Sequence, residues 1–175
     1  MQAIDYSNKR ALIIDTSALV RSSTATMLVK LGFVQVKGSN VSSRALELVA
    51  AEDFDLVLLG HSETDRNSGL QLLEEARHKA LIKPSACWGF MSADNSPAVI
   101  LHASESEPDF VISKPFTLVQ LQSRLQSGLS RKQAVQPINQ ALEDGNITRA
   151  LEFCDFVLDK KLSLLPVKQK KADLL

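Results

Sequence analysis

The sequence has few cysteines, no long apolar run and no excess charge of either sign. Its two cysteines, Cys87 and Cys154, form no C-x-x-C motif and have no histidine at the spacing of a zinc site, which predicts free buried thiols. No apolar run approaches the roughly 20 residues that cross a bilayer, and residues 1–10 lack the hydrophobic core of a secretory signal. Basic and acidic residues number 20 each, which argues against nucleic acid or an anionic membrane surface as the main partner. These absences predict a soluble cytoplasmic protein without membrane insertion.

Patterns of buried strands alternate with patterns of amphipathic helices along most of the chain. With 175 residues and 45% hydrophobic content, there is room for one domain with a real core plus an appendage. The predicted strands cover residues 11–14, 33–36, 55–59, 85–90 and 110–112, and the predicted helices begin near residues 18, 43, 69, 97 and 117. Ser17 is a predicted N-cap of the first helix, and Gly32 is its predicted end. Strands that are each followed by a helix require a parallel sheet with helices on both faces.

Polar residues stand at the predicted carboxyl ends of these strands, where an open α/β sheet forms its ligand crevice. Asp15 and Thr16 end the first strand. Ser92 ends the fourth strand, and Lys114 follows the fifth. The third strand is an apolar run that ends on Gly60, which has no side chain. We therefore expect a carboxylate, a hydroxyl and an amine around a position without a functional group.

Several segments resemble the receiver domain of bacterial response regulators, over about residues 8–130. They are ALIIDTSALVR at the first strand, DLVLLG followed by SGLQLLEEAR, the pair Ser92-Ala93, and DFVISKPF, whose Lys-Pro-Phe is the most specific. The resemblance implies a flavodoxin-like fold, with a five-stranded parallel sheet in the order 2-1-3-4-5. It also implies bacterial two-component signal transduction. The protein partner would be a sensor histidine kinase or another regulator of the same pathway, and a homodimer is a further option.

The resemblance also implies what each residue at the strand ends would do. In working receivers, two acidic residues after the first strand help to hold a magnesium ion, and an aspartate at the end of the third strand accepts the phosphoryl group. In this chain those places fall on Asp15, Thr16 and Gly60, so two of the three carboxylates are missing. Ser92 and Lys114 match the hydroxyl and the amine that contact the phosphoryl oxygens. Magnesium usually needs one or two carboxylates besides phosphate oxygens, so Asp15 alone would bind it weakly or not at all.

Without an acceptor carboxylate there is no nucleophile to carry a phosphoryl group. The expectation is a degenerate receiver, or pseudo-receiver, that is not an enzyme, has no catalytic residue or cofactor, and acts through protein contacts. Lys114 would then pair with Asp15, because its amine has lost the acceptor carboxylate. Ser92 would serve as a loop or cap hydroxyl, and Asp94 and Asn95 would cap the following helix.

Other interpretations of the vacated crevice stay open. Asp15, Glu63 or Asp65 could act as a substitute phosphoryl acceptor. His61 could be an acceptor or a metal ligand. Alternatively, the space left by Gly60 could bind a small metabolite, which would make the chain a sensor.

The aromatic residue through which receivers relay phosphorylation is also displaced. Its usual place, three residues before the lysine, holds Val111, and Phe110 lies one place earlier. This departure predicts an altered relay between the site and the partner surface.

From about residue 131 the pattern changes. The preceding helix should end near residue 129, and Pro137 is expected to interrupt the helical pattern after it. Beyond it, residues 138–142 and 147–158 form two amphipathic segments around a turn at residues 144–146. The spacing of Gly145 and Ala150 resembles the tetratricopeptide repeat, in which a small residue lets paired helices approach closely. The prediction is a receiver-like domain at residues 1–130 and a helical extension at residues 131–175, which would be the first repeat helices of a longer chain.

Overall fold

A parallel β-sheet forms the centre of the first of two units, Met1–Gly128 and Leu129–Leu175. The computed structural model describes residues 4–61, 69–94, 96, 97, 99, 101, 107–159 and 165–175. The strands in these ranges are β1 (Arg10–Ile14), β2 (Gln35–Ser39), β3 (Leu56–His61), β4 (Cys87–Ser92) and β5 (Phe110–Ser113). All pair in parallel, in the order β2-β1-β3-β4-β5, which confirms the predicted flavodoxin-like sheet.

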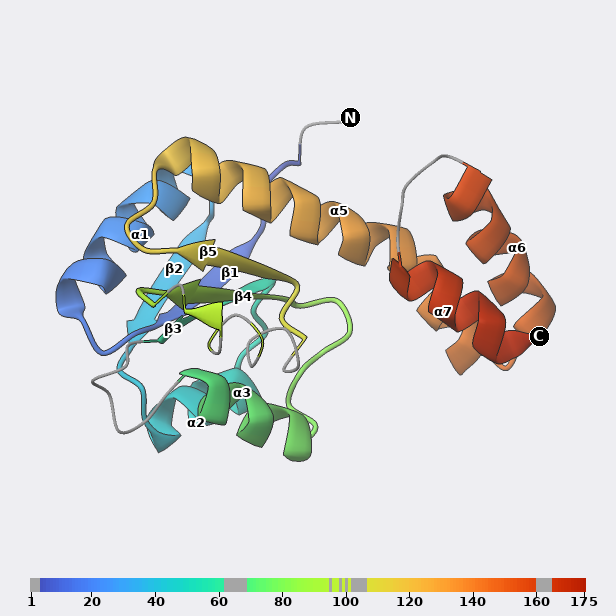
Figure 1. Ribbon diagram of the computed structural model, residues 1–175, viewed down its shortest axis with the longest axis horizontal. Helices are drawn as coiled ribbons and strands as arrows, with labels where there is room; N and C mark the ends of the chain where they lie inside the picture. The colour runs from blue at the N-terminus through green and yellow to red at the C-terminus, as the bar shows by residue number, and fades with distance from the viewer. Residues whose placement is uncertain are drawn as a thin grey trace. The chain divides into compact units, whose positions relative to one another are not determined.

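Helices cover both faces of this sheet. The described helices are α1 (Ala18–Leu31), α2 (Ser43–Ala51), α3 (Gly69–His78), α5 (Leu118–Glu143), α6 (Ile147–Asp159) and α7 (Leu165–Leu174). Figure 1 shows α1 and the start of α5 on one face, and α2 and α3 on the other. Strands β3 and β4 are therefore buried almost throughout, which explains why their sequences are nearly continuous apolar runs. Within the described ranges, no helix has the length and apolar character that a bilayer crossing requires.

Local motifs define both ends of α1 as predicted. The Ser17 hydroxyl accepts a hydrogen bond from the Val20 amide at 3.3 Å, which is an N-cap contact. Gly32 adopts a left-handed conformation with φ of 106°, and its amide reaches back to the helix carbonyls. Ser17 thus begins α1 at the C-terminal edge of the sheet, just after β1, and Gly32 ends it shortly before β2.

The second strand begins later than the sequence predicts. Residues 33–36 were the predicted strand, but β2 is Gln35–Ser39. The Phe33 amide donates to the Leu28 carbonyl at 3.1 Å, so Phe33 belongs to the helix-ending motif. Its ring is buried and stacks on Tyr6, with ring centroids 5.0 Å apart. An apolar residue placed by a helix end was thus wrongly predicted to belong to a strand.

Two other strands extend further toward the crevice than predicted. β3 and β4 pair with each other as far as His61 and Ser92, so both continue past residues 59 and 90. The predicted helix at 97–103 lies largely outside the described residues, of which 97, 99 and 101 are helical.

The prediction that Pro137 interrupts the chain's helical pattern is wrong. α5 continues through Pro137 to Glu143. Proline removes one backbone hydrogen bond from a helix, at the carbonyl four residues earlier. Here Pro137 and Gln133 are both exposed, so water can satisfy that carbonyl. The next residue, Ile138, is fully buried in an apolar cluster, which stabilises the helix beyond the proline.

The second unit contains the end of α5 together with α6 and α7. Its turn is the predicted one: Gly145 has φ of 70°, and the Asn146 side chain caps α6 by accepting from the Arg149 amide at 3.0 Å. The buried core of this unit consists of small and medium side chains, namely Ile138, Ala141, Ala150, Cys154 and Val157. Small residues at this contact allow the helices to pack closely.

A charge cluster at the N-terminal edge of the sheet yields a pH-dependent prediction. Glu52 accepts from Lys37 at 2.6 Å and from Arg10 at 2.5 Å, and the Lys37 hydrogen bond is the largest cause that lowers the pKa of Glu52. A carboxyl group with a lowered pKa in the folded state stabilises the fold above its unfolded pKa and loses this effect as pH falls through the folded pKa. Glu52→Gln should therefore lower the melting temperature at neutral pH and have a smaller effect at about pH 3, because that effect is lost as pH falls through the lowered pKa of Glu52. An equal loss at both pH values would contradict this assignment.

Candidate functional site

The strand ends bring three of the predicted site residues together at the C-terminal edge of the sheet. Asp15 directly follows β1, Gly60 is the second-last residue of β3, and Lys114 directly follows β5. Parallel strands place these ends at one edge of the sheet, so residues far apart in the sequence become neighbours. Asp15 is only 2% exposed.

Asp15 and Lys114 form the ion pair that the sequence predicts. The Lys114 Nζ donates to Asp15 Oδ2 at 2.9 Å. The other carboxylate oxygen, Oδ1, accepts from the Ser17 amide at 2.8 Å. The Lys114 side chain is 14% exposed, so the pair is largely withdrawn from water. Both carboxylate oxygens are therefore engaged by the protein itself.

Gly60 is required by the position of the Asp15 side chain. A Cβ atom placed on Gly60 would overlap the Asp15 carboxylate and lie 2.9 Å from the Asp15 Cβ, closer than real Cβ atoms approach. The carboxylate of Asp15 thus fills the space in which a side chain at residue 60 would begin. The buried ion pair in its present position therefore depends on the absence of a side chain at residue 60.

Arg21 is a contributor that the sequence reasoning missed. From α1 it donates through one nitrogen, Nη1, to the carbonyls of Asp15 at 2.6 Å and Thr16 at 3.1 Å. Its side chain passes over Gly38, where an added Cβ would lie 3.5 Å from the Arg21 Cδ. Side chains on a helix point toward its N-terminus, so an arginine one turn after Ser17 was the available signal. The guanidinium adds positive charge beside Asp15, which disfavours a divalent cation there.

The Ser92 side chain forms hydrogen bonds with its own loop. Its buried hydroxyl donates to the Asp94 carbonyl at 2.6 Å and accepts from the Asp94 amide at 3.1 Å, as a loop hydroxyl would. The expected helix cap at Asp94 is replaced by Ser96, whose hydroxyl accepts from the Val99 amide at 3.4 Å. The Asp94 carboxylate instead accepts hydrogen bonds from the amide and the hydroxyl of Ser96, which closes a tight turn before the helix. Asn95 lies outside the described residues.

The remaining candidates are only partly described. His61 ends β3, pairs with Ser92 across the sheet, and its ring lies 5.6 Å from the Phe90 ring. Glu63 and Asp65 fall in the undescribed range 62–68. In the described parts of the chain, no three histidine, cysteine or acidic side chains are grouped to hold a metal ion.

Phe110 is held inside the fold. Its ring is buried above Gly89 and beside Gly128, where added Cβ atoms would come within 2.6 Å and 3.1 Å of ring carbons. Two glycines therefore make room for this ring. Val111, at the usual switch position, is half-buried and aliphatic.

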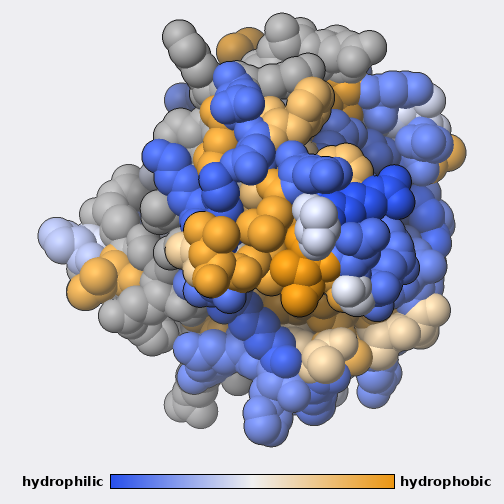
Figure 2. Space-filling model, turned by 90° about the vertical axis from the view of Figure 1, so that its right-hand side faces the viewer, coloured by the Kyte–Doolittle hydropathy of each residue, from blue (hydrophilic) through white to orange (hydrophobic). Residues whose placement is uncertain are grey.

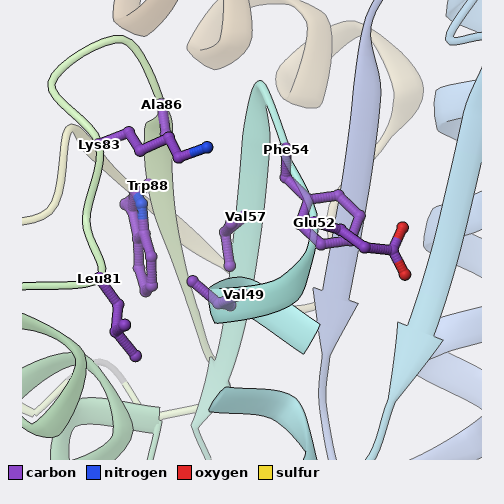
Figure 3. A pocket seen from close by; sticks show the side chains of 8 residues that line it. All are labelled: Val49, Glu52, Phe54, Val57, Leu81, Lys83, Ala86 and Trp88. Carbon is purple, nitrogen blue, oxygen red and sulfur yellow. The ribbon is translucent and has the colours of Figure 1, made fainter. Parts of the chain in front are cut away.

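Cavities lie on both faces of the sheet, lined by described residues. One, of about 520 Å³, lies next to the ion pair, between α1 and the loop from β5 to α5. The other, of about 10 Å³, lies on the opposite face, where Trp88 and Phe54 contribute to its lining (Figure 3). The second has the volume of about one water molecule, which is too small for a metabolite.

Comparison with known proteins identifies the fold and the family. The family model of the response regulator receiver domain matches residues 11–126. The chain belongs to this family. Receiver domains act in two-component signalling and interact with proteins such as kinases or other regulators. A comparison with curated proteins gives no significant match.

Solved receiver structures share the fold at low sequence identity. A CheY-like receiver domain protein from Methanospirillum hungatei JF-1 is 24% identical, with a TM-score of 0.62, over 73% of this chain and 98% of that chain. A response regulator from Thermotoga maritima is 23% identical, with a TM-score of 0.59, over 70% and 98%. A response regulator from Burkholderia pseudomallei, solved with a phosphorylated aspartic acid, calcium ion and citrate, is 23% identical, with a TM-score of 0.59, over 90% and 100%. At this identity the likeness supports the receiver fold.

Proposed function

We propose that this receiver is degenerate and acts in two-component signalling through protein contacts instead of phosphoryl transfer. The observation that carries the proposal is the Asp15 carboxylate, which lies where a side chain of residue 60 would begin and is bound to Lys114. A phosphoryl acceptor needs a nucleophile at that place, and glycine supplies none. On this view the chain is not an enzyme and needs no cofactor.

The same arrangement disfavours the magnesium ion that working receivers use. Asp15 has one oxygen on Lys114 and the other on the Ser17 amide, so binding a metal would require breaking one of these contacts. Thr16 supplies no second carboxylate, and Arg21 adds positive charge nearby. Magnesium binds with near-octahedral oxygen coordination and usually through carboxylates, so its affinity here should be weak.

Incubation with acetyl phosphate and magnesium tests this proposal. The intact mass of the purified chain should stay unchanged, whereas a receiver that has its acceptor aspartate, treated in parallel, should gain one phosphoryl group. The reason is that residue 60 carries no carboxylate, and the Asp15 carboxylate that fills its space is already bound to Lys114 and the Ser17 amide. A stoichiometric adduct would refute the proposal. Asp15→Asn, Glu63→Gln and Asp65→Asn would then show which carboxylate acts as a substitute acceptor.

Protein contact is also the role we propose for the second unit, as a tetratricopeptide-like module. Ala150 and Ala141 lie fully or almost fully buried in its core, as close packing of paired helices requires. Ile147, Phe156 and Leu175 are exposed apolar residues, and Figure 2, which looks onto α6 and α7, shows apolar surface bordered by hydrophilic side chains. One helical repeat cannot bury its own apolar face, so this surface suits further repeats or a protein partner. We place this activity in the bacterial cytoplasm, with a sensor kinase, another regulator or a second copy as partner.

A further inference from the structure

The large cavity beside the ion pair has the dimensions of a small-molecule site. Its volume of about 520 Å³ falls within the range of about 300–1,000 Å³ that is typical of ligand pockets. An apolar cavity of about 150 Å³ already binds benzene, so a molecule with two or three rings would fit. Its lining comes mainly from α1 and from the loop that leads from β5 into α5, two segments that can be located in Figure 1. The apolar part of the lining consists of Leu19, Val20, Met27, Ala93, Pro115 and Phe116.

Lys114 supplies the polar end of this cavity. A lysine ammonium has three donors, and among the described residues Lys114 uses one of them, on Asp15. The ammonium can therefore donate to a ligand without breaking the ion pair. A largely buried ammonium favours a ligand with an acceptor oxygen over a hydrocarbon.

The charge of the ligand follows from Asp15. Asp15 lines the same cavity, and its carboxylate already balances the Lys114 charge. An anionic ligand on Lys114 would place a second negative charge close to this buried carboxylate, and the repulsion would weaken binding of the ligand. A cationic ligand would have to displace Lys114 or the Ser17 amide, since these occupy the two carboxylate oxygens. A neutral carbonyl group satisfies the spare donors at the least electrostatic cost.

We propose that this cavity binds an uncharged, largely apolar small molecule through a carbonyl oxygen that accepts a hydrogen bond from Lys114. The inference rests on the proposed function, because Lys114 is available to a ligand only while no phosphoryl group occupies it. It assigns a sensory role to a place where other receivers hold phosphate.

A matched pair of probes tests both the site and its charge preference. Naphthylacetamide and naphthylacetate share their ring system and differ in whether the polar group is a neutral amide or a carboxylate. In an NMR titration of the isotope-labelled full chain, the amide should cause saturable shifts in α1 and at residues 115–117. The carboxylate should bind at least about tenfold more weakly, equivalent to about 1.4 kcal/mol.

Substitutions on the outer wall locate the binding. Lys114→Ala is unsuitable alone, because it also breaks a buried ion pair. Ser23 and Ser22 are adjacent exposed residues of α1, and their hydroxyls donate to the carbonyls three residues earlier at 3.2 Å and 3.1 Å. Only Ser23 lines the cavity. Ser23→Phe should therefore abolish amide binding, and Ser22→Phe should leave it unchanged, with the same melting temperature in both variants.

Three results would overturn the inference: no saturable shifts with the amide, tighter binding of the carboxylate than of the amide, or equal effects of Ser22→Phe and Ser23→Phe. Phosphorylation is read separately by mass. A phosphoryl adduct together with normal binding of naphthylacetamide would refute the proposed function alone. If the chain forms no phosphoryl adduct and does not bind naphthylacetamide, the ligand site alone is refuted.

Discussion

Gly60→Ala should destabilise the first unit by about 3 kcal/mol or more, although it adds a single methyl group. The new Cβ would overlap the carboxylate of Asp15, which would have to leave its buried pairing with Lys114. Backbone conformation is not the obstacle, because Gly60 lies in a regular strand outside the left-handed region. Urea denaturation followed by fluorescence measures this loss, since Trp88 in β4 is the single tryptophan of the sequence and is buried.

Two control variants separate this explanation from a general intolerance of β-carbons at the strand ends. Gly38→Ala in β2 should change stability by less than about 0.5 kcal/mol, because its Cβ would make an ordinary contact with Arg21 at 3.5 Å. In an Asp15→Gly background, Gly60→Ala should cost less than about 1 kcal/mol, because the overlapping atoms are gone. Equal costs of Gly60→Ala in both backgrounds would contradict the proposed coupling.

Lys114→Met should destabilise the chain by about 3 kcal/mol, through loss of charge with little loss of volume. Methionine keeps most of the aliphatic stem, but the buried Asp15 carboxylate would keep the Ser17 amide and lose the ammonium that balances its charge. The cost of an unpaired buried charge exceeds the cost of a broken surface ion pair, which is typically below about 1 kcal/mol. Urea denaturation followed by Trp88 fluorescence measures the loss of stability caused by Lys114→Met.

The matched control for this prediction removes the charge that is left behind. Asp15→Asn in the Lys114→Met background should recover about 1 to 2 kcal/mol, because a neutral amide is less costly to bury than an unpaired carboxylate. For comparison, Glu75 of α3 and Lys79, just beyond its end, form an exposed pair, and Lys79→Met should cost less than about 0.5 kcal/mol. If Lys114→Met behaves like Lys79→Met, the ion pair contributes little to the fold.

Local motifs and the resemblance were sufficient to predict much of the fold. Ser17 and Gly32 act through contacts within one turn of α1, so their effect can be read from neighbouring residues. The strand order followed from the family likeness. In contrast, Phe33 and Pro137 were misjudged because their placement depends on partners distant in sequence: Phe33 stacks on Tyr6, and the helix beyond Pro137 is held by packing in the second unit.

The candidate site was predicted in its components but not in its geometry. The pairing of Asp15 with Lys114 followed from charge, since an amine near a vacated carboxylate position needs a partner. No sequence pattern indicates that the Asp15 side chain leans toward Gly60, because that depends on the spacing of β1 and β3. The contacts of Arg21 were missed for a similar reason: an arginine in the first turns of a helix is most often a solvated side chain.

The overlap between residue 60 and Asp15 also has an evolutionary consequence. A lineage that carried this arrangement could not regain phosphorylation by a single substitution of glycine with aspartate, because the new side chain would meet an occupied space and an unstable intermediate would result. The Asp15 side chain would have to turn out of that space, and this movement removes the partner of a buried ammonium. Loss of the acceptor is therefore difficult to reverse. Selection can more readily modify how the protein binds its partners than restore phosphorylation.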